Sequence, residues 1–151
     1  MVASIGPTPA TTATFCATLV DEWVRLGVAH AVVSPGSRST PMALALSSNP
    51  KIALHIFHDE RSASFAALGI GLQSGIPAVL LCTSGTAAAQ FFAAVIEASY
   101  AHVPLLVCTA DRPPELQGVG APQTINQTHL YGTFVRKFID AGLADDAKSS
   151  K

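Results

Sequence analysis

Short apolar runs alternate with longer segments of helical periodicity along the chain, and this alternation limits the folds that it can adopt. We expect strands at residues 30–33, 53–57, 78–82, 105–108 and 134–139. We expect helices at residues 10–27, 41–47, 60–73, 86–100 and 124–130. Apolar strands that alternate with helices are typical of parallel βαβ units, in which helices cover both faces of the sheet. The pattern predicts an α/β fold with an open, doubly wound, mainly parallel sheet.

The composition excludes several classes of protein. Of the 151 residues, 49% are hydrophobic and only 13% are charged, whereas about a quarter of the residues in soluble domains are charged. The apolar content excludes a disordered chain, and the length predicts one domain. Nine Lys and Arg against ten Asp and Glu give a net charge of −1, which excludes a strongly basic nucleic-acid-binding surface. So few charges predict either poor solubility or a surface covered by other protein.

No segment predicts export or membrane insertion. Residues 1–20 contain no Lys or Arg, so we expect no secretory signal. The most apolar stretch, residues 86–110, is interrupted by Gln90, Glu97, His102 and Pro104, so we expect no transmembrane span. The three cysteines lack CxxC spacing and predict free thiols in a reducing compartment. We therefore expect a cytoplasmic protein.

Each of the first four predicted strands is followed at once by a polar or glycine-rich cluster. The clusters read SPGSR (34–38), HDER (58–61), TSGT (83–86) and TADR (109–112). In an open parallel sheet the carboxyl ends of the strands share one edge, where ligands bind. Helix N-termini at that edge offer N–H groups to anions, and Gly36 and Gly85 would let a ligand approach the backbone closely. The clusters therefore predict a ligand site.

Three charged side chains within these clusters are candidate site residues. Glu60 begins a predicted helix, where a carboxylate can simply favour the helix dipole, but the neighbouring Asp59 already fits the capping role. Arg38 and Arg112 suit bidentate recognition of a carboxylate or phosphate, with surface ion pairs as the alternative. We expect no metal site, because the spacing of His55 and His58 on a strand points their rings to opposite faces. These spacings predict a ligand site but no particular reaction.

Longer strings within the same clusters resemble one enzyme family. The strings are SPGSRSTP (34–41), HDER (58–61), CTSGTA (82–87) and TADRPPEL (109–116). They closely resemble the thiamine-diphosphate enzyme family of 2-succinyl-5-enolpyruvyl-6-hydroxy-3-cyclohexene-1-carboxylate synthases, which act in menaquinone and phylloquinone biosynthesis. The resemblance covers nearly the whole chain but only the N-terminal, pyrimidine-binding domain of the family. It implies such a domain at residues 1–142, with a polar tail at 143–151 that leads to middle and diphosphate-binding domains absent here.

The resemblance also implies roles for individual residues. Glu60 would be the catalytic glutamate that hydrogen-bonds the aminopyrimidine ring of thiamine diphosphate, and Ser84, Gly85 and Thr86 would lie beside that ring. Substrate-binding positions would be Ser37, Arg38, Arg112 and Gln123. Mg²⁺ (or Mn²⁺) would be bound mainly by the C-terminal domain, with no metal ligands in this chain. Where the family usually reads GANQ, this chain reads GAPQ at 120–123, and Pro122 removes an amide side chain and a backbone N–H.

The implied reaction is decarboxylation of 2-oxoglutarate and addition of the resulting succinyl carbanion to isochorismate. The implied partners are these two small molecules and further copies of the chain, as a dimer or a dimer of dimers, without nucleic acid or membrane insertion. The thin surface charge would then mark an interface, so the chain alone is expected to self-associate and to be inactive. Two alternatives remain: a small subunit of a split thiamine-diphosphate 2-oxoacid decarboxylase, and a non-catalytic α/β module that binds a carboxylate.

Overall fold

The structure of the chain, a computed structural model, describes residues 8–144. Within these residues, the strands are β1 (His30–Val33), β2 (Ala53–Ile56), β3 (Val79–Cys82) and β4 (Leu106–Thr109). The helices are α1 (Pro9–Arg25), α2 (Thr40–Ser48), α3 (Glu60–Ser74), α4 (Thr86–Gln90) and α5 (Phe92–Ala101). Short 3₁₀ turns are η1 (Ser37–Ser39), η2 (Pro114–Leu116) and η3 (Gly132–Phe134).

The strands form one parallel sheet in the order β2-β1-β3-β4. Val32 of β1 is central in it, because it pairs with His55 of β2 on one side and with Leu80 of β3 on the other. From β1 the chain goes outward to β2 and then crosses back to the other side of β1 to form β3. The strand order therefore reverses between β1 and β3. In open α/β sheets, ligands bind at the carboxyl ends of the two strands where the order reverses, a place here called the crevice.

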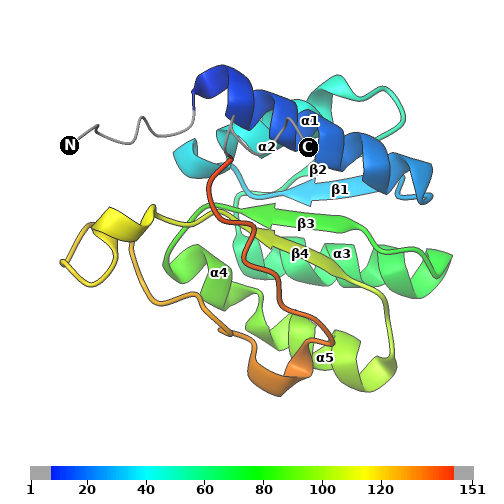
Figure 1. Ribbon diagram of the computed structural model, residues 1–151. Helices are drawn as coiled ribbons and strands as arrows, with labels where there is room; N and C mark the ends of the chain where they lie inside the picture. The colour runs from blue at the N-terminus through cyan, green and yellow to red at the C-terminus, as the bar shows by residue number, and fades with distance from the viewer. Residues whose placement is uncertain (1–7, 145–151) are drawn as a thin grey trace.

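Helices cover both faces of the sheet, as the apolar strands predicted (Figure 1). Helices α1 and α2 cover one face, where Val20 and Leu46 pack on Val33 and Leu81. Helices α3, α4 and α5 cover the other, where Ala63, Ala67 and Phe91 pack on strand residues that include Leu80. Both layers are needed because the strands β1 and β3 are buried almost completely. The predicted fold class is confirmed.

Two elements predicted near the C-terminus are not formed. Residues 134–139 were expected to be a strand, but only Phe134 lies in a regular element, the turn η3, and the rest have no repeating structure. The run carries Arg136 and Lys137 side by side and exposed, so it cannot be buried on both faces. In the segment expected to be a helix at 124–130, residues 124–127 have no regular structure and residues 128–130 form a turn, in which His129 has a left-handed backbone with φ of 53°.

The helix predicted at residues 86–100 is interrupted. It divides at Phe91, which lies between α4 and α5 and whose side chain is completely buried. At the break, the carbonyl oxygen of Ala88 accepts a hydrogen bond from the Phe91 amide at 3.2 Å and another from the Tyr131 hydroxyl at 2.8 Å. This tight 3₁₀-type turn redirects the chain, so that Phe91 can reach the core.

Two helices end in left-handed residues at the edge of the sheet opposite the crevice. Gly75, with φ of 70°, ends α3 and donates its N–H to Gly71 at 2.9 Å. His102, with φ of 56°, ends α5 and donates its N–H to Ala98. Glycine adopts this conformation without steric cost, whereas a residue with a Cβ is strained by about 1–2 kcal/mol. The end of α3 therefore has the residue type suited to this conformation, and the end of α5 does not.

Exchanging the residue types at these two ends should shift stability in opposite directions. Gly75→Ala should lower the free energy of unfolding by about 1 kcal/mol through backbone strain alone, since nothing lies within 4 Å of the added methyl group. His102→Gly should raise it by up to about 1 kcal/mol. Urea unfolding of the two variants and the wild type measures both effects, and a change of the same sign in both would contradict this interpretation.

Candidate functional site

The carboxyl ends of β1 and β3 are closely packed. The Ser34 amide donates to the Leu81 carbonyl at 2.9 Å, which extends the pairing of β1 and β3 by one residue. A Cβ on Gly36 would overlap with Cβ of Thr83, and a Cβ on Gly85 would lie 2.9 Å from the Gln123 carbonyl oxygen. On the side where a Cβ would stand, both glycines therefore make room for neighbouring parts of the same chain. That they let a ligand approach the backbone stays a prediction.

Glu60 is the first residue of α3, and the capping role there belongs to Asp59, as predicted. Asp59 accepts hydrogen bonds from the Ser62 hydroxyl and the Ser62 amide, both at 2.7 Å, and these bonds lower the pKa of its carboxyl group. Glu60 is half-buried, and its carboxylate makes no hydrogen bond or ion pair with any of residues 8–144. The fold therefore leaves a partly desolvated carboxylate without a partner beside the crevice.

The surroundings of Cys82 place the Glu60 carboxylate near the end of β3. Burial raises the pKa of the Cys82 thiol strongly, and the nearby negative charge of Glu60 raises it further. The Cys82 side chain is completely buried at the last residue of β3. A thiol held in its neutral form is a poor nucleophile, so Cys82 is a structural residue of this end of β3.

Arg38 and Arg112 also lie close to each other at this edge. Desolvation lowers the pKa of the Arg112 guanidinium group, and the positive charge of Arg38 lowers it further. Arg112 donates from Nη2 to the Pro122 carbonyl oxygen, and its buried Nε has no partner. Neither arginine forms an ion pair with a carboxylate within the described part of the chain. Two neighbouring guanidinium groups without a counter-ion favour an anionic ligand.

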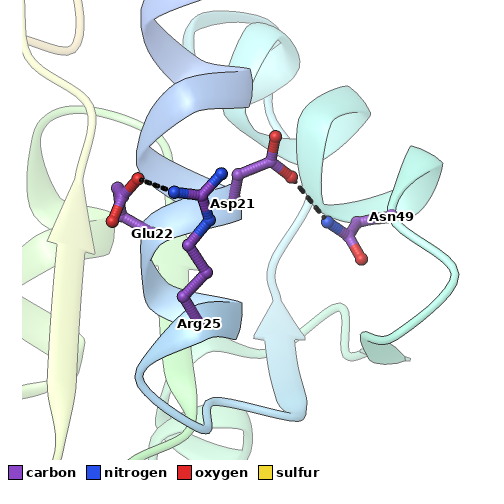
Figure 2. A network of polar contacts seen from close by, with 4 residues as sticks. All are labelled: Asp21, Glu22, Arg25 and Asn49. Carbon is purple, nitrogen blue, oxygen red and sulfur yellow. Dashed lines mark hydrogen bonds and ion pairs between the residues drawn. The ribbon is translucent and has the colours of Figure 1, made fainter.

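The ion pair that the structure does show lies elsewhere. Arg25 and Glu22 are 3.1 Å apart near the C-terminal end of α1 and are mostly exposed (Figure 2). Beside them, Asp21 accepts a hydrogen bond at 3.0 Å from Asn49, which caps α2 (Figure 2). Helix α1 ends where β1 begins, so the Arg25–Glu22 pair lies at the edge of the sheet opposite the crevice. The alternative that Arg38 and Arg112 serve surface ion pairs is therefore not supported.

The remaining predicted site residues differ in how much the chain itself engages them. Ser37, Thr86 and Gln123 are exposed, and their side chains have no hydrogen-bond partner within residues 8–144. In contrast, the Ser84 hydroxyl donates to the Gln123 carbonyl oxygen at 2.9 Å, and the Gly85 amide donates to Oε1 of Gln127 at 2.7 Å. The Gly85 amide at the start of α4 is therefore not available to an anion.

Gln127 is the site residue that the sequence did not reveal. Its side chain is only 7% exposed, and its Nε2 donates to the Thr109 hydroxyl at 3.2 Å and to the Ala110 carbonyl at 3.1 Å. It thereby joins the end of β4 to the turn after β3. No motif or spacing singles it out, because it lies in an irregular segment that was predicted to be a helix.

The described residues offer no ready metal site and no membrane helix. Between residues 8 and 144, no group of three or more His, Cys, Asp or Glu side chains could hold a metal ion. His55, set aside above, contacts His30 instead, with Nε2 of His55 3.1 Å from Nδ1 of His30. No helix in the same range is both long enough and apolar enough to cross a membrane.

Comparison with known proteins identifies the family. The family described as thiamine pyrophosphate enzyme, N-terminal TPP binding domain, matches residues 13–130. The chain belongs to this family. Thiamine pyrophosphate and thiamine diphosphate are the same cofactor, so the resemblance drawn from the strings at the strand ends is confirmed. The crevice at the β1/β3 reversal lies within the matched residues of this TPP-binding domain.

Relatives with a more specific name are also found. The chain is 58% identical over 129 residues to the 2-succinyl-5-enolpyruvyl-6-hydroxy-3-cyclohexene-1-carboxylate synthase of Lysinibacillus sphaericus. The aligned residues make up 85% of this chain and 23% of that protein. It is 57% identical over 127 residues to the synthase of Thermobifida fusca, and these residues make up 84% of this chain and 23% of the relative. The synthase of Listeria innocua is 51% identical over 133 residues, which make up 88% of this chain and 23% of that synthase. The chain thus spans about a quarter of the length of these curated relatives.

Stability measurements should separate the roles of the two neighbouring carboxylates in this TPP-binding domain. The hydrogen bonds from Ser62 hold the pKa of Asp59 below its ordinary value, so their stabilising effect is complete above about pH 4 and is lost as the pH falls through the folded-state pKa. Asp59→Asn keeps an oxygen for the cap and should remove this acid dependence. Glu60→Gln should change the free energy of unfolding by less than about 0.5 kcal/mol.

Urea unfolding at pH 7 and pH 3 measures these effects. The wild type should lose more stability in acid than Asp59→Asn does, and Glu60→Gln should follow the wild type. A large loss of stability at pH 7 in Glu60→Gln would show that the Glu60 carboxylate has a structural partner, and it would contradict the assignment of Glu60 to a ligand.

Proposed function

We propose that this chain is the pyrimidine-binding part of a cytoplasmic 2-succinyl-5-enolpyruvyl-6-hydroxy-3-cyclohexene-1-carboxylate synthase of menaquinone biosynthesis. The proposed reaction releases CO₂ from 2-oxoglutarate and joins the remaining succinyl unit to isochorismate. The observation that carries the proposal is the unpartnered Glu60 carboxylate at the head of α3, beside the β1/β3 crevice. The names of the relatives support the choice of reaction within the family.

The residues at the crevice fit the aminopyrimidine ring of thiamine diphosphate. When bound, this cofactor supplies the nucleophilic carbon and the electron sink for decarboxylation. Glu60 would hold a proton between its carboxyl group and a nitrogen of the ring, because no group among residues 8–144 competes for that carboxyl group. The turn of Ser84, Gly85 and Thr86 would flank the ring mainly by its shape, since the Ser84 hydroxyl and the Gly85 amide already have partners.

We propose that the diphosphate group is bound outside this chain. The Gly85 amide at the start of α4 is engaged by Gln127, and the described residues provide no metal-binding group. The diphosphate and Mg²⁺ (or Mn²⁺) would therefore be bound outside this chain, by a C-terminal domain. Residues 1–142 would form the pyrimidine domain and 143–151 the tail leading to the other domains, although residues 1–7 and 145–151 lie outside the described range.

The arginines are suited to the proposed substrates, because both substrates are carboxylates. Arg38 and Arg112 would bind carboxylate groups, and the buried, unpartnered Nε of Arg112 is a donor that a ligand oxygen could satisfy. Ser37 and Gln123 would add hydrogen bonds from the two sides of the crevice. The Pro122 carbonyl accepts from Arg112, so the proline that departs from the family pattern still orients one of these arginines.

Removing the acid–base function of Glu60 should abolish most of the activity. In the full-length enzyme, Glu60→Gln should lower kcat by about 10²–10⁴-fold, the usual effect of losing a general acid–base group. The measurement is the rate of isochorismate-dependent CO₂ release from 2-oxoglutarate. Glu97→Gln, which changes an exposed carboxylate of α5, is the matched control and should retain full activity. Near wild-type turnover in Glu60→Gln would exclude the proposed role.

We also propose that the protein forms a homo-oligomer through α3. Beyond Arg61 this helix carries no charged residue. Phe65 and Leu72 on the helix, followed by Ile76, are 44%, 69% and 43% exposed. They recur at the spacing of one helix face. An uncharged apolar stripe of this kind suits contact with a second copy of itself about a twofold axis, and it accounts for part of the low surface charge.

A charge on this stripe should disrupt the oligomer. Leu72→Asp should weaken self-association of the full-length protein by at least about tenfold, because it would bury an unpaired carboxylate. Leu26→Asp is the matched control, since Leu26 is 81% exposed near the end of α1, outside the stripe. Sedimentation analysis over a range of concentrations measures both variants. Equal behaviour of Leu72→Asp and the wild type would exclude α3 from the interface.

A further inference from the structure

Residues 122–131, here called the strap, cross the carboxyl ends of β3 and β4. They are fastened to the turn after β3 and to α4 at three points. The Ser84 hydroxyl donates to the Gln123 carbonyl at 2.9 Å, the Gly85 amide donates to the Gln127 side chain at 2.7 Å, and the Tyr131 hydroxyl donates to the Ala88 carbonyl at 2.8 Å. No helix or strand organises the strap, so these bonds define its path.

Gln127 is the most thoroughly bonded of these groups. Its Oε1 accepts from Gly85, and its Nε2 donates to Thr109 and Ala110, so that one buried amide uses both of its ends. An unsatisfied amide at such a site would cost about 1–3 kcal/mol. The geometry is therefore specific for Gln: an acceptor is needed toward the β3 turn and a donor toward the end of β4.

The strap holds Gln123 in a conformation that a residue with a side chain rarely adopts. Its φ is 57°, in the left-handed region, and such a conformation persists only where surrounding contacts enforce it. The Ser84 hydroxyl fixes the Gln123 carbonyl. The backbone and Cγ of Gln123 also lie so close to Gly85 that a Cβ there would approach them to about 3.0 Å. Gln123 is exposed, and the end of its side chain has no hydrogen-bond partner within the described residues.

We propose that Ser84 and Gln127 are positioning residues that act through Gln123. Together they hold its backbone in the left-handed conformation, so that its side-chain amide is aimed at the substrate before the substrate binds. This inference rests on the proposed function for the identity of the substrate. It assigns Ser84 a different role from the cofactor contact expected from the sequence, and it adds Gln127, for which no role was expected.

A double-mutant cycle in the full-length enzyme tests whether Ser84 acts through Gln123. Ser84→Ala and Gln123→Ala should each lower kcat/KM for 2-oxoglutarate and isochorismate by about tenfold, the usual effect of one lost hydrogen bond to a polar group. The double variant should be no worse than Gln123→Ala alone, because without the amide its position no longer matters. If the fold-losses of the two single variants multiplied in the double variant, Ser84 would act on the ligand independently of Gln123, and the proposal would be overturned.

A pH profile tests Gln127. In Gln127→Glu, the carboxylate can still accept from Gly85 but cannot donate to Ala110, so kcat/KM should fall about tenfold at pH 8. Burial against a carbonyl oxygen raises the pKa of that carboxyl group. Activity relative to the wild type should therefore recover as the pH falls toward about 6. Gln127→Leu should lose activity at every pH, and Thr128→Ala, a change at the exposed neighbour, should match the wild type. If kcat/KM of Gln127→Glu relative to that of the wild type stayed constant across this pH range, the role of Gln127 would be overturned.

Hydrogen exchange separates failure of this inference from failure of the proposed function. Without substrate, Ser84→Ala and Gln127→Leu should increase amide exchange in residues 122–127, whereas Thr128→Ala should not. If the wild-type enzyme lacked synthase activity but the exchange changed as expected, the proposed reaction would be wrong and the positioning of Gln123 would stand. Unchanged exchange in both variants would overturn the positioning role, whatever the activity.

Discussion

Parallel pairing of β1 with both β2 and β3 determines where everything else in the molecule lies. Because β1 is central and the order is β2-β1-β3-β4, the chain must reverse its direction of winding between β1 and β3. The carboxyl ends of these strands then hold four polar clusters at one edge, and α3 begins there with Glu60. The apolar residues that make the pairing possible, such as Val32 and Leu80, have no part in the chemistry, but they bring residues distant in sequence into one crevice.

Within that crevice, polar groups divide into those that the chain satisfies itself and those that it leaves for a ligand. The Ser84 hydroxyl and the Gly85 amide are engaged by the strap. The Glu60 carboxylate and the Arg38 guanidinium group have no partner among residues 8–144. In our proposal, the unpaired carboxyl group meets a heterocycle with a basic ring nitrogen, and the two guanidinium groups, which have no carboxylate partner among residues 8–144, meet substrates with carboxylates. The diphosphate is bound, in the same proposal, by a domain outside this chain.

The sequence predicted the class of fold and the edge of the site because both depend on local patterns. Apolar runs marked β1 to β4 to within a residue or two, and the residue types after each run marked the crevice. Features set by tertiary contacts were not predictable. Phe91 interrupts a helix because its ring reaches the core, and Gln127 matters because folding brings it to Gly85 and Ala110, distant in sequence. The charged pair Arg136 and Lys137 prevented the last predicted strand from being buried.

The central claim is that Glu60 is left unpaired by the fold in order to bind the aminopyrimidine ring of the cofactor. The most direct test is a crystal structure of the full-length protein with thiamine diphosphate and Mg²⁺. The account predicts a hydrogen bond between the Glu60 carboxyl group and a ring nitrogen, with the Gly85 amide still bonded to Gln127 and the diphosphate bound outside residues 8–144. A diphosphate at the start of α4, or a ring nitrogen bonded to a group other than Glu60, would contradict it.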